Sequence, residues 1–278
     1  MNQVCDLHTH SHFSDGTFAP TQIVEAAVAL GLSAVALCDH NTVDGLPEFL
    51  AAAQKKPIHA VAGAEFSVDY EGTELHLLGL YLPENSFDRI SQLMATVQER
   101  KEESNFALVQ SLNAAGYALD YETIKAASPT SKINRAHIAR ALTEAGYTES
   151  ISQAFQALLA PEQGHYREPE RLTVWQMLTF LQEIGAVPVL AHPFLNLTED
   201  ALRNFLPEAK KAGLRGMECR YSLYKPHETA LSMELAASFD LLPSGGSDFH
   251  GANKPHIALG SGTGDLAVPG RWAEALKP

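Results

Sequence analysis

The chain has 278 residues and a formal net charge of −13, which argues against a general nucleic-acid-binding surface and against duplex DNA as a partner, because such surfaces are normally basic. No apolar run is long enough to span a bilayer and no secretory signal opens the sequence, so we predict a cytoplasmic protein without a membrane segment. The three cysteines stand in apolar, strand-like runs, which indicates buried reduced thiols rather than a disulfide framework.

Strand-like and helix-like runs alternate in the first and last parts of the chain. The first part predicts strands over Val4–Leu7, Ala34–Leu37, Ile58–Ala62 and Leu75–Leu80, with helices over Thr21–Leu30 and Val43–Gln54. The last two of these strands are predicted to flank a hairpin at Tyr70-Glu71-Gly72. The last part predicts strands over Val187–Leu190, Gly216–Cys219 and Leu241–Pro243, with helices over Glu199–Ala212 and Pro226–Ser238. Short apolar strands separated by helices are typical of a parallel sheet closed into a barrel.

The middle of the chain has a different pattern. It shows little strand signal, and helical patterns run through Asp88–Ala115, Asn134–Ala145 and Ser152–Leu159. We therefore predict an α/β protein in which residues 1–84 and 172–278 form the barrel. Residues 85–171 are predicted to be a helical insertion that caps the mouth of the barrel.

Residue types that bind metals gather where the predicted strands end. His8 and His10 occupy alternate positions at the end of the first strand, so both side chains point the same way and can ligate one metal. Asp15, in the following loop, lies far enough along the chain to reach a second metal. Four later clusters stand in similar places: Cys38–His40, Gly63–Glu65, Ala191–Pro193 and Ser247–His250. Together they predict an active site at the mouth of the barrel.

The candidate metal ligands are His8, His10, Asp15, His40, Glu65, His76, His192, Asp248 and His250. This set exceeds what one or two sites need and suits three. Imidazole and carboxylate groups without thiolate fit Mn²⁺, Fe²⁺ or Zn²⁺, and we predict two to three divalent ions. His76 has the weakest positional signal, since residues 74–78 also read as an ordinary half-exposed strand. Asp39 is better suited to orienting a ligand or a backbone group.

These motifs resemble the PHP family, named for polymerase and histidinol phosphatase. The matching stretches are His8–Ser11 with Ser14–Gly16, Cys38–Thr42, Gly63–Glu65, His76, Ala191–Pro193 and Ser247–His250. The resemblance implies a distorted (β/α)7 barrel with a trinuclear metal site. It assigns His8, His10, Glu65 and Asp248 to one metal, Asp15, His40 and His250 to a second, and Glu65, His76 and His192 to a third.

The inserted segment resembles one subgroup of this family, the 3′,5′-nucleoside bisphosphate phosphatases and RNase AM. The similarity lies in Asn134–Arg140 and in the helix around Glu99–Lys101. It implies that inserted helices supply cations to a second phosphate, and the candidates here are Arg100, Lys101, Arg135 and His137. One departure is Phe194–Asn196, which follows His192-Pro193 where the subgroup has Gly-Arg-Tyr. A basic residue that would help to read the substrate is therefore absent from this loop.

The resemblance implies hydrolysis of a phosphate monoester by a metal-activated water. The predicted substrate is a 3′,5′-nucleoside bisphosphate or the 5′ end of a short oligonucleotide, and the acidic surface favours a small phosphorylated molecule over longer RNA. His250 and His137 are predicted to contact substrate, and one of them to protonate the leaving oxygen. Asp15 completes the predicted catalytic set.

Three alternatives remain open at this point. The first is another phosphoesterase of the same barrel, either histidinol-phosphatase-like or a general phosphomonoesterase. The second is an amidohydrolase acting on a C–N bond, although no lysine stands at a strand end where it would bridge two metals. The third is a PHP-type binding module without chemistry, against which the full ligand set argues.

Overall fold

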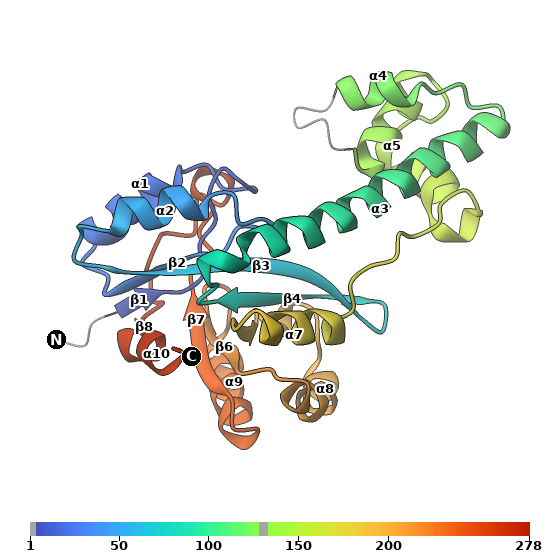
Figure 1. Cartoon of the computed structure of the whole chain (residues 1–278). Coiled ribbons are helices and arrows are strands. Elements are labelled where there is room, and N and C mark those ends of the chain that lie inside the picture. Colours follow the sequence, from blue (N-terminus) through green and yellow to red (C-terminus); the bar gives the residue numbers. More distant parts are fainter. Residues whose placement is uncertain (1–3, 128–132) are drawn as a thin grey trace. The chain divides into compact units, whose positions relative to one another are not determined.

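The computed structural model describes residues 4–127 and 133–278. The chain divides into two compact units (Figure 1). The barrel unit is Met1–Gln92 with Leu172–Pro278, and the helical unit is Leu93–Arg171. Within the described ranges, no helix is long and apolar enough to cross a membrane.

One sheet forms the centre of the barrel unit. Its strands are β1 (Val4–Asp6), β2 (Ala34–Leu37), β3 (His59–Tyr70), β4 (Thr73–Leu80), β5 (Val187–Leu190), β6 (Gly216–Tyr221), β7 (Leu242–Gly246) and β8 (Val268–Pro269). Their order across the sheet is β7-β6-β5-β4-β3-β2-β1-β8. The pairs β1–β2, β2–β3, β5–β6 and β6–β7 are parallel, whereas β4 runs antiparallel to both of its neighbours.

Strand β7, at one end of this order, meets β1, which stands next to the strand at the other end. The backbone N–H of Leu7 donates to the Gly245 carbonyl at 3.1 Å, and that of Asp248 donates to the His8 carbonyl at 2.8 Å. A third bond joins the His10 N–H to the Phe249 carbonyl at 2.9 Å. The sheet is therefore nearly closed, and the predicted distorted (β/α)7 barrel is confirmed. The same bonds bring the loops after β1 and β7 together.

Helices cover the outside of this sheet. They are α1 (Pro20–Ala29), α2 (Leu46–Ala53), α7 (Val174–Glu183), α8 (Glu199–Lys211), α9 (Pro226–Ser238) and α10 (Gly270–Ala275), with short 3₁₀ turns at Glu84–Ser86, Pro193–Leu195 and Gly251–Asn253. Helix α8 shows why such segments fold: Thr198 caps its first turn by accepting from the Ala201 N–H. Leu202, Phe205 and Leu206 recur at the spacing of one helix face and are fully buried.

The helical unit has a core of its own. It contains residues 93–114 of α3 (Phe87–Ala114), then α4 (Tyr121–Ala126), α5 (Arg135–Glu144), α6 (Ile151–Ala154), a π-helical turn (Phe155–Leu159) and a 3₁₀ turn (Pro161–Gln163). Leu108, Ile138, Leu142 and Leu159 are among its fully buried side chains. The predicted helix over 152–159 is thus α-helical only to Ala154 and continues as the π turn.

The predicted hairpin at Tyr70-Glu71-Gly72 joins β3 to β4, which pair antiparallel. Glu71 has φ 52° and Gly72 has φ 84°, and two successive positive φ values make the tight turn that joins neighbouring antiparallel strands. The chain therefore returns directly as β4 without a crossover helix. The strand predicted over 58–62 consequently extends to Tyr70, and Glu65 lies inside β3 rather than at its end.

Gly246 provides a test of the contact between β7 and β1. A Cβ at this position would overlap the backbone nitrogen and the Cβ of His8. We expect Gly246→Ala to lower the free energy of unfolding by roughly 1–3 kcal/mol, because the added methyl overpacks the closure. The substitution should also weaken metal binding, since it displaces His8. Urea unfolding and metal titration measure both effects.

Gly72→Ala is the matched control for this prediction. No atom lies within 4 Å of a Cβ at Gly72, although its φ is +84°, so this substitution should cost about 1–2 kcal/mol through backbone strain alone. It should leave metal affinity unchanged. Wild-type stability and wild-type metal affinity in Gly246→Ala would contradict the closure described above.

Candidate metal centre

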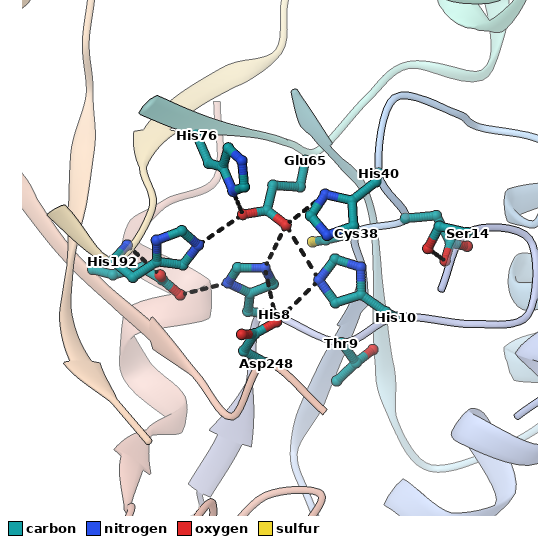
Figure 2. Close-up of polar contacts among 12 residues, drawn as sticks. His8, Thr9, His10, Ser14, Cys38, His40, Glu65, His76, His192 and Asp248 are labelled. Carbon is teal, nitrogen blue, oxygen red and sulfur yellow. Dashed lines mark hydrogen bonds and ion pairs between the residues drawn. The ribbon is translucent and has the colours of Figure 1, made fainter. Parts of the chain in front are cut away.

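The side chain of Glu65 lies at the centre of a group of histidines (Figure 2). It is fully buried. Its Oε1 lies 2.8 Å from His76 Nδ1 and 2.9 Å from His192 Nε2. Its Oε2 lies 3.1–3.3 Å from ring nitrogens of three further histidines, His8, His10 and His40. One carboxylate is therefore shared among five imidazoles that come from β1, β2, β4 and β5 or from the loops that follow them.

Asp248 borders the same group from the loop after β7. Its Oδ1 lies 3.2 Å from His10 Nε2. Its Oδ2 accepts from the Tyr221 hydroxyl at 2.8 Å and from Lys254 Nζ at 2.7 Å. The two oxygens thus have separate surroundings, one facing the histidines and the other held by neutral and cationic donors. Asp248 has φ 59°, so the backbone takes a left-handed turn as the chain leaves β7.

Asp15 approaches the group from the opposite loop, which follows β1. Its Oδ1 lies 3.1 Å from His250 Nε2, and its Oδ2 lies 3.7 Å from His40 Nε2. His10 Nδ1 is 3.8 Å away. Unlike the other two carboxylates, Asp15 is about half exposed, which leaves this side of the group open to solvent. All nine predicted ligands therefore lie together in the barrel unit.

The donor atoms in this group fit bound metal ions. Buried atoms of Glu65 and four histidines have no hydrogen-bond partner among the described residues: Glu65 Oε2, His8 Nε2, both ring nitrogens of His10, His192 Nδ1 and His250 Nε2. Such buried polar atoms are costly unless something binds them. Three sets of residues can each place their donor atoms within 4.8 Å of one another. They are His8-His10-Glu65, His10-Asp15-His40-His250 and His40-Glu65-His76. Imidazole and carboxylate ligands suit divalent transition metals.

The pKa values of the group show how strongly its members depend on each other. Burial alone would raise the pKa of Glu65, but the charge of His8 and the neighbouring imidazole of His10 hold it well below its usual value. Burial would lower the pKa of His76, but its hydrogen bonds to Glu65 and Glu74 raise it to about 9. Burial lowers the pKa of His40 to about 4, against the attraction of Glu65. The imidazoles of the group thus differ in how strongly they hold a proton.

Glu218 is a buried carboxylate that the sequence reasoning did not select. Its Oε1 lies 3.0 Å from His8 Nδ1, and its Oε2 accepts from the backbone N–H of His192 at 2.7 Å. A carboxylate on Nδ1 of His8 directs Nε2 toward Glu65, a common arrangement behind metal-binding histidines. The available signal was one acidic residue inside the predicted strand 216–219, whose other residues are apolar or glycine.

Two more buried carboxylates hold the loops that present ligands. Asp39 accepts from the backbone N–H and the hydroxyl of Ser11 at 2.7 and 2.6 Å, and from the Ser14 hydroxyl at 2.6 Å. It orders the turn that leads to Asp15, in agreement with the orienting role predicted for it. Asp6 accepts from the backbone N–H and the hydroxyl of Ser247, next to Asp248, at 2.8 and 2.6 Å.

The predicted substrate-binding cations belong to the helical unit. Arg100 pairs with Glu170 at 3.3 Å, and Lys101 is exposed. The guanidinium of Arg135 stacks on the ring of Tyr166, 4.2 Å from its centroid. Asn134, at the N-terminus of α5, caps that helix and donates its own backbone N–H to the imidazole of His137. All of these contacts join residues of the helical unit.

Comparison with known proteins identifies the class. A family model described as the PHP domain matches residues 6–166. A 5′-3′ exoribonuclease of Haemophilus influenzae is 30% identical over 251 residues, which cover 90% of this chain and 91% of that protein. A 3′,5′-nucleoside bisphosphate phosphatase of Chromobacterium violaceum is 28% identical, covering 88% and 86%. A crystal structure from Bifidobacterium adolescentis, classed as a metal-dependent phosphoesterase, is 28% identical with a TM-score of 0.69, covering 99% and 96%.

A barrel with a Glu65-centred cluster, together with these relatives, defines a metal-dependent phosphoester hydrolase. The chain belongs to the PHP family. The predicted reaction class and the predicted family are both confirmed, and the reading as a binding module without chemistry loses its support. The relatives act on different phosphoesters, so they do not settle the substrate of this chain.

Metal affinity should increase with pH across the range in which the cluster histidines titrate. His76 has a pKa of about 9, and burial is outweighed at His8 by the charges of Glu218 and Glu65, which raise its pKa well above the usual value. These imidazoles must lose their protons to bind a metal. We expect Mn²⁺ binding to release protons and to tighten from pH 6 to pH 9. Calorimetry in buffers of different ionisation enthalpy counts the protons.

His59 offers a control for this titration. It lies outside the cluster, 3.4 Å from Glu274. Mn²⁺ binding to the His59→Gln variant should therefore release the same number of protons as binding to the wild type. Mn²⁺ binding that is independent of pH and releases no protons would contradict the assignment of these histidines as ligands.

Proposed function

We propose that this chain hydrolyses a phosphate monoester of a small nucleotide, either a 3′,5′-nucleoside bisphosphate or the 5′ end of a short oligonucleotide. The observation that carries the proposal is the Glu65-centred cluster, in which one buried carboxylate contacts five imidazoles. Two relatives that cover most of the chain are named as a 3′,5′-nucleoside bisphosphate phosphatase and as a 5′-3′ exoribonuclease, which supports a nucleotide substrate. The strongly acidic composition supports a small substrate over duplex DNA. A cytoplasmic location stays a prediction.

We propose that two to three divalent ions, Mn²⁺, Fe²⁺ or Zn²⁺, are held by the nine predicted ligands. When bound, such ions would activate a water molecule and offset the charge of the phosphate. His10 and His40 each belong to two of the donor sets, and Glu65 belongs to two as well. The sets are therefore interdependent, and loss of one shared side chain should affect more than one ion.

The two candidate proton donors differ in their hydrogen bonds. His250 Nδ1 lies 2.8 Å from the Asp248 carbonyl, so Nδ1 carries the proton and Nε2, which faces Asp15, is left free to ligate a metal. His137 Nδ1 accepts from the Asn134 N–H, so its Nε2 carries the proton. His250 is thus suited to ligating a metal, and His137 stays the predicted proton donor from the helical unit. In this assignment His250 and Asp15 serve as neighbouring metal ligands on the solvent-exposed side of the cluster.

Phosphate release by the Mn²⁺-loaded protein tests the substrate assignment. The panel is adenosine 3′,5′-bisphosphate, 5′-AMP, histidinol phosphate and a short 5′-phosphorylated RNA. We expect the highest kcat/KM with the bisphosphate or with the RNA. Equal or faster turnover of histidinol phosphate or 5′-AMP would overturn the nucleotide assignment and leave a general phosphomonoesterase.

Arg135 tests the proposed recognition of a second phosphate. Arg135→Lys keeps a charge but loses the planar group that stacks on Tyr166. We expect kcat/KM for adenosine 3′,5′-bisphosphate to fall about tenfold or more, equivalent to roughly 1.5–3 kcal/mol for a charged hydrogen bond. Turnover of 5′-AMP should change less, because it has no second phosphate.

Arg140→Lys is the matched control on the same helix. Arg140 is exposed on α5 and is not among the predicted substrate contacts, so this variant should turn over both substrates at the wild-type rate. An equal fall for both substrates in Arg135→Lys, or none for either, would count against a second-phosphate role.

A further inference from the structure

Lys254 places a cation directly beside the metal-ligand group. Its Nζ lies 2.7 Å from Asp248 Oδ2, whose carboxylate side chain is only 5% exposed. The lysine side chain is itself 36% exposed, so it reaches from solvent to the edge of the cluster. An ammonium group has three donors, and the contact with Asp248 uses one of them.

The backbone around Lys254 is fixed against the loop that carries Asp15. The Asn253 side-chain amide donates to the Asp15 carbonyl at 2.7 Å, and the Ala252 N–H donates to the Thr17 hydroxyl at 2.9 Å. Gly251 adopts φ 63°, and a Cβ there would overlap Thr17 Oγ1. The loop after β7 is therefore packed tightly on the loop after β1, which holds Lys254 at this edge.

Asp248 does not need Lys254 to satisfy its outer oxygen. The Tyr221 hydroxyl already donates to Oδ2 at 2.8 Å. A lysine that served only to neutralise Asp248 would be expected to be buried with it, because its ammonium would then interact in a low dielectric. Instead the side chain is partly open to solvent, where a ligand can reach its remaining donors.

The charge around the cluster makes such a cation useful. Asp15, Glu65 and Asp248 all carry negative charge here, and a phosphate dianion has to approach them. The loop after His192 brings Phe194, Leu195 and Asn196, none of which is a cation. Lys254 therefore supplies positive charge at a place where phosphate charge would otherwise be repelled.

We propose that Lys254 is a substrate-contacting residue whose ammonium donates to a non-bridging oxygen of the bound phosphate while it keeps its contact with Asp248. Lysine binds phosphate as a compact point charge with rotatable donors, and such a group stabilises charge on a transferring phosphoryl group. The inference rests on the proposed phosphoesterase site, but not on which nucleotide the site accepts.

Binding of inorganic phosphate to the full-length, Mn²⁺-loaded protein tests this role. We expect Lys254→Met to raise the Kd for phosphate about tenfold or more, while the metal content stays at the wild-type value. Lys254→Arg should recover part of the affinity. The salt dependence of phosphate binding should also become weaker in Lys254→Met, because one cation is missing.

Lys56→Met is the matched control. Lys56 is 32% exposed and pairs with Glu25 at 3.2 Å in the same barrel unit, and its removal should leave phosphate binding unchanged. Wild-type phosphate affinity in Lys254→Met would overturn the proposal. So would a fall in metal content that accounts for the whole loss of phosphate affinity, because Lys254 would then only support Asp248. Inorganic phosphate lacks a nucleoside, so failure of the nucleotide assignment would leave this test intact.

Discussion

The structure depends on how a fully buried carboxylate, Glu65, is stabilised away from water. Moving such a charge into the interior is expensive unless it is paired and hydrogen-bonded. Here the pairing comes from five imidazoles at 2.8–3.3 Å. Because these histidines come from four different strands or their loops, strands β1 to β5 have to be assembled before the carboxylate is paired. The site and the fold therefore stabilise each other.

Further buried carboxylates extend this arrangement outward. Glu218 joins His8 to the backbone of His192, Asp39 orders the turn before Asp15, and Asp6 binds Ser247 next to Asp248. Each one positions a ligand without itself facing the cluster centre. These positioning roles account for part of the acidic composition. It also concentrates negative charge at the place where a phosphate has to bind, which gives the metals and Lys254 their importance.

Much of the fold and of the candidate site could be predicted because both follow local patterns. The apolar runs at Ala34–Leu37 and Val187–Leu190 mark strands with their observed bounds, and the strand-end motifs place His8, His10 and His192. The turn residues Tyr70-Glu71-Gly72 likewise predicted the hairpin that joins β3 to the antiparallel strand β4. Glu218 was missed because its role depends on a contact with His8, which is 210 residues away. The stacking of Arg135 on Tyr166 likewise depends on packing that sequence spacing does not reveal.

Replacement of the central carboxylate by its neutral isostere, Glu65→Gln, tests the account most directly. The measurement is the number of Mn²⁺ ions retained per chain, determined by elemental analysis, together with phosphate release. Two to three ions in the wild type, a loss of at least one ion in Glu65→Gln and a fall in turnover of more than about 100-fold are predicted, since even residues behind the ligands cost 10–100-fold. Glu71→Gln, at the exposed hairpin turn, should behave as the wild type. Full metal content and wild-type turnover in Glu65→Gln would contradict the central role given to this carboxylate.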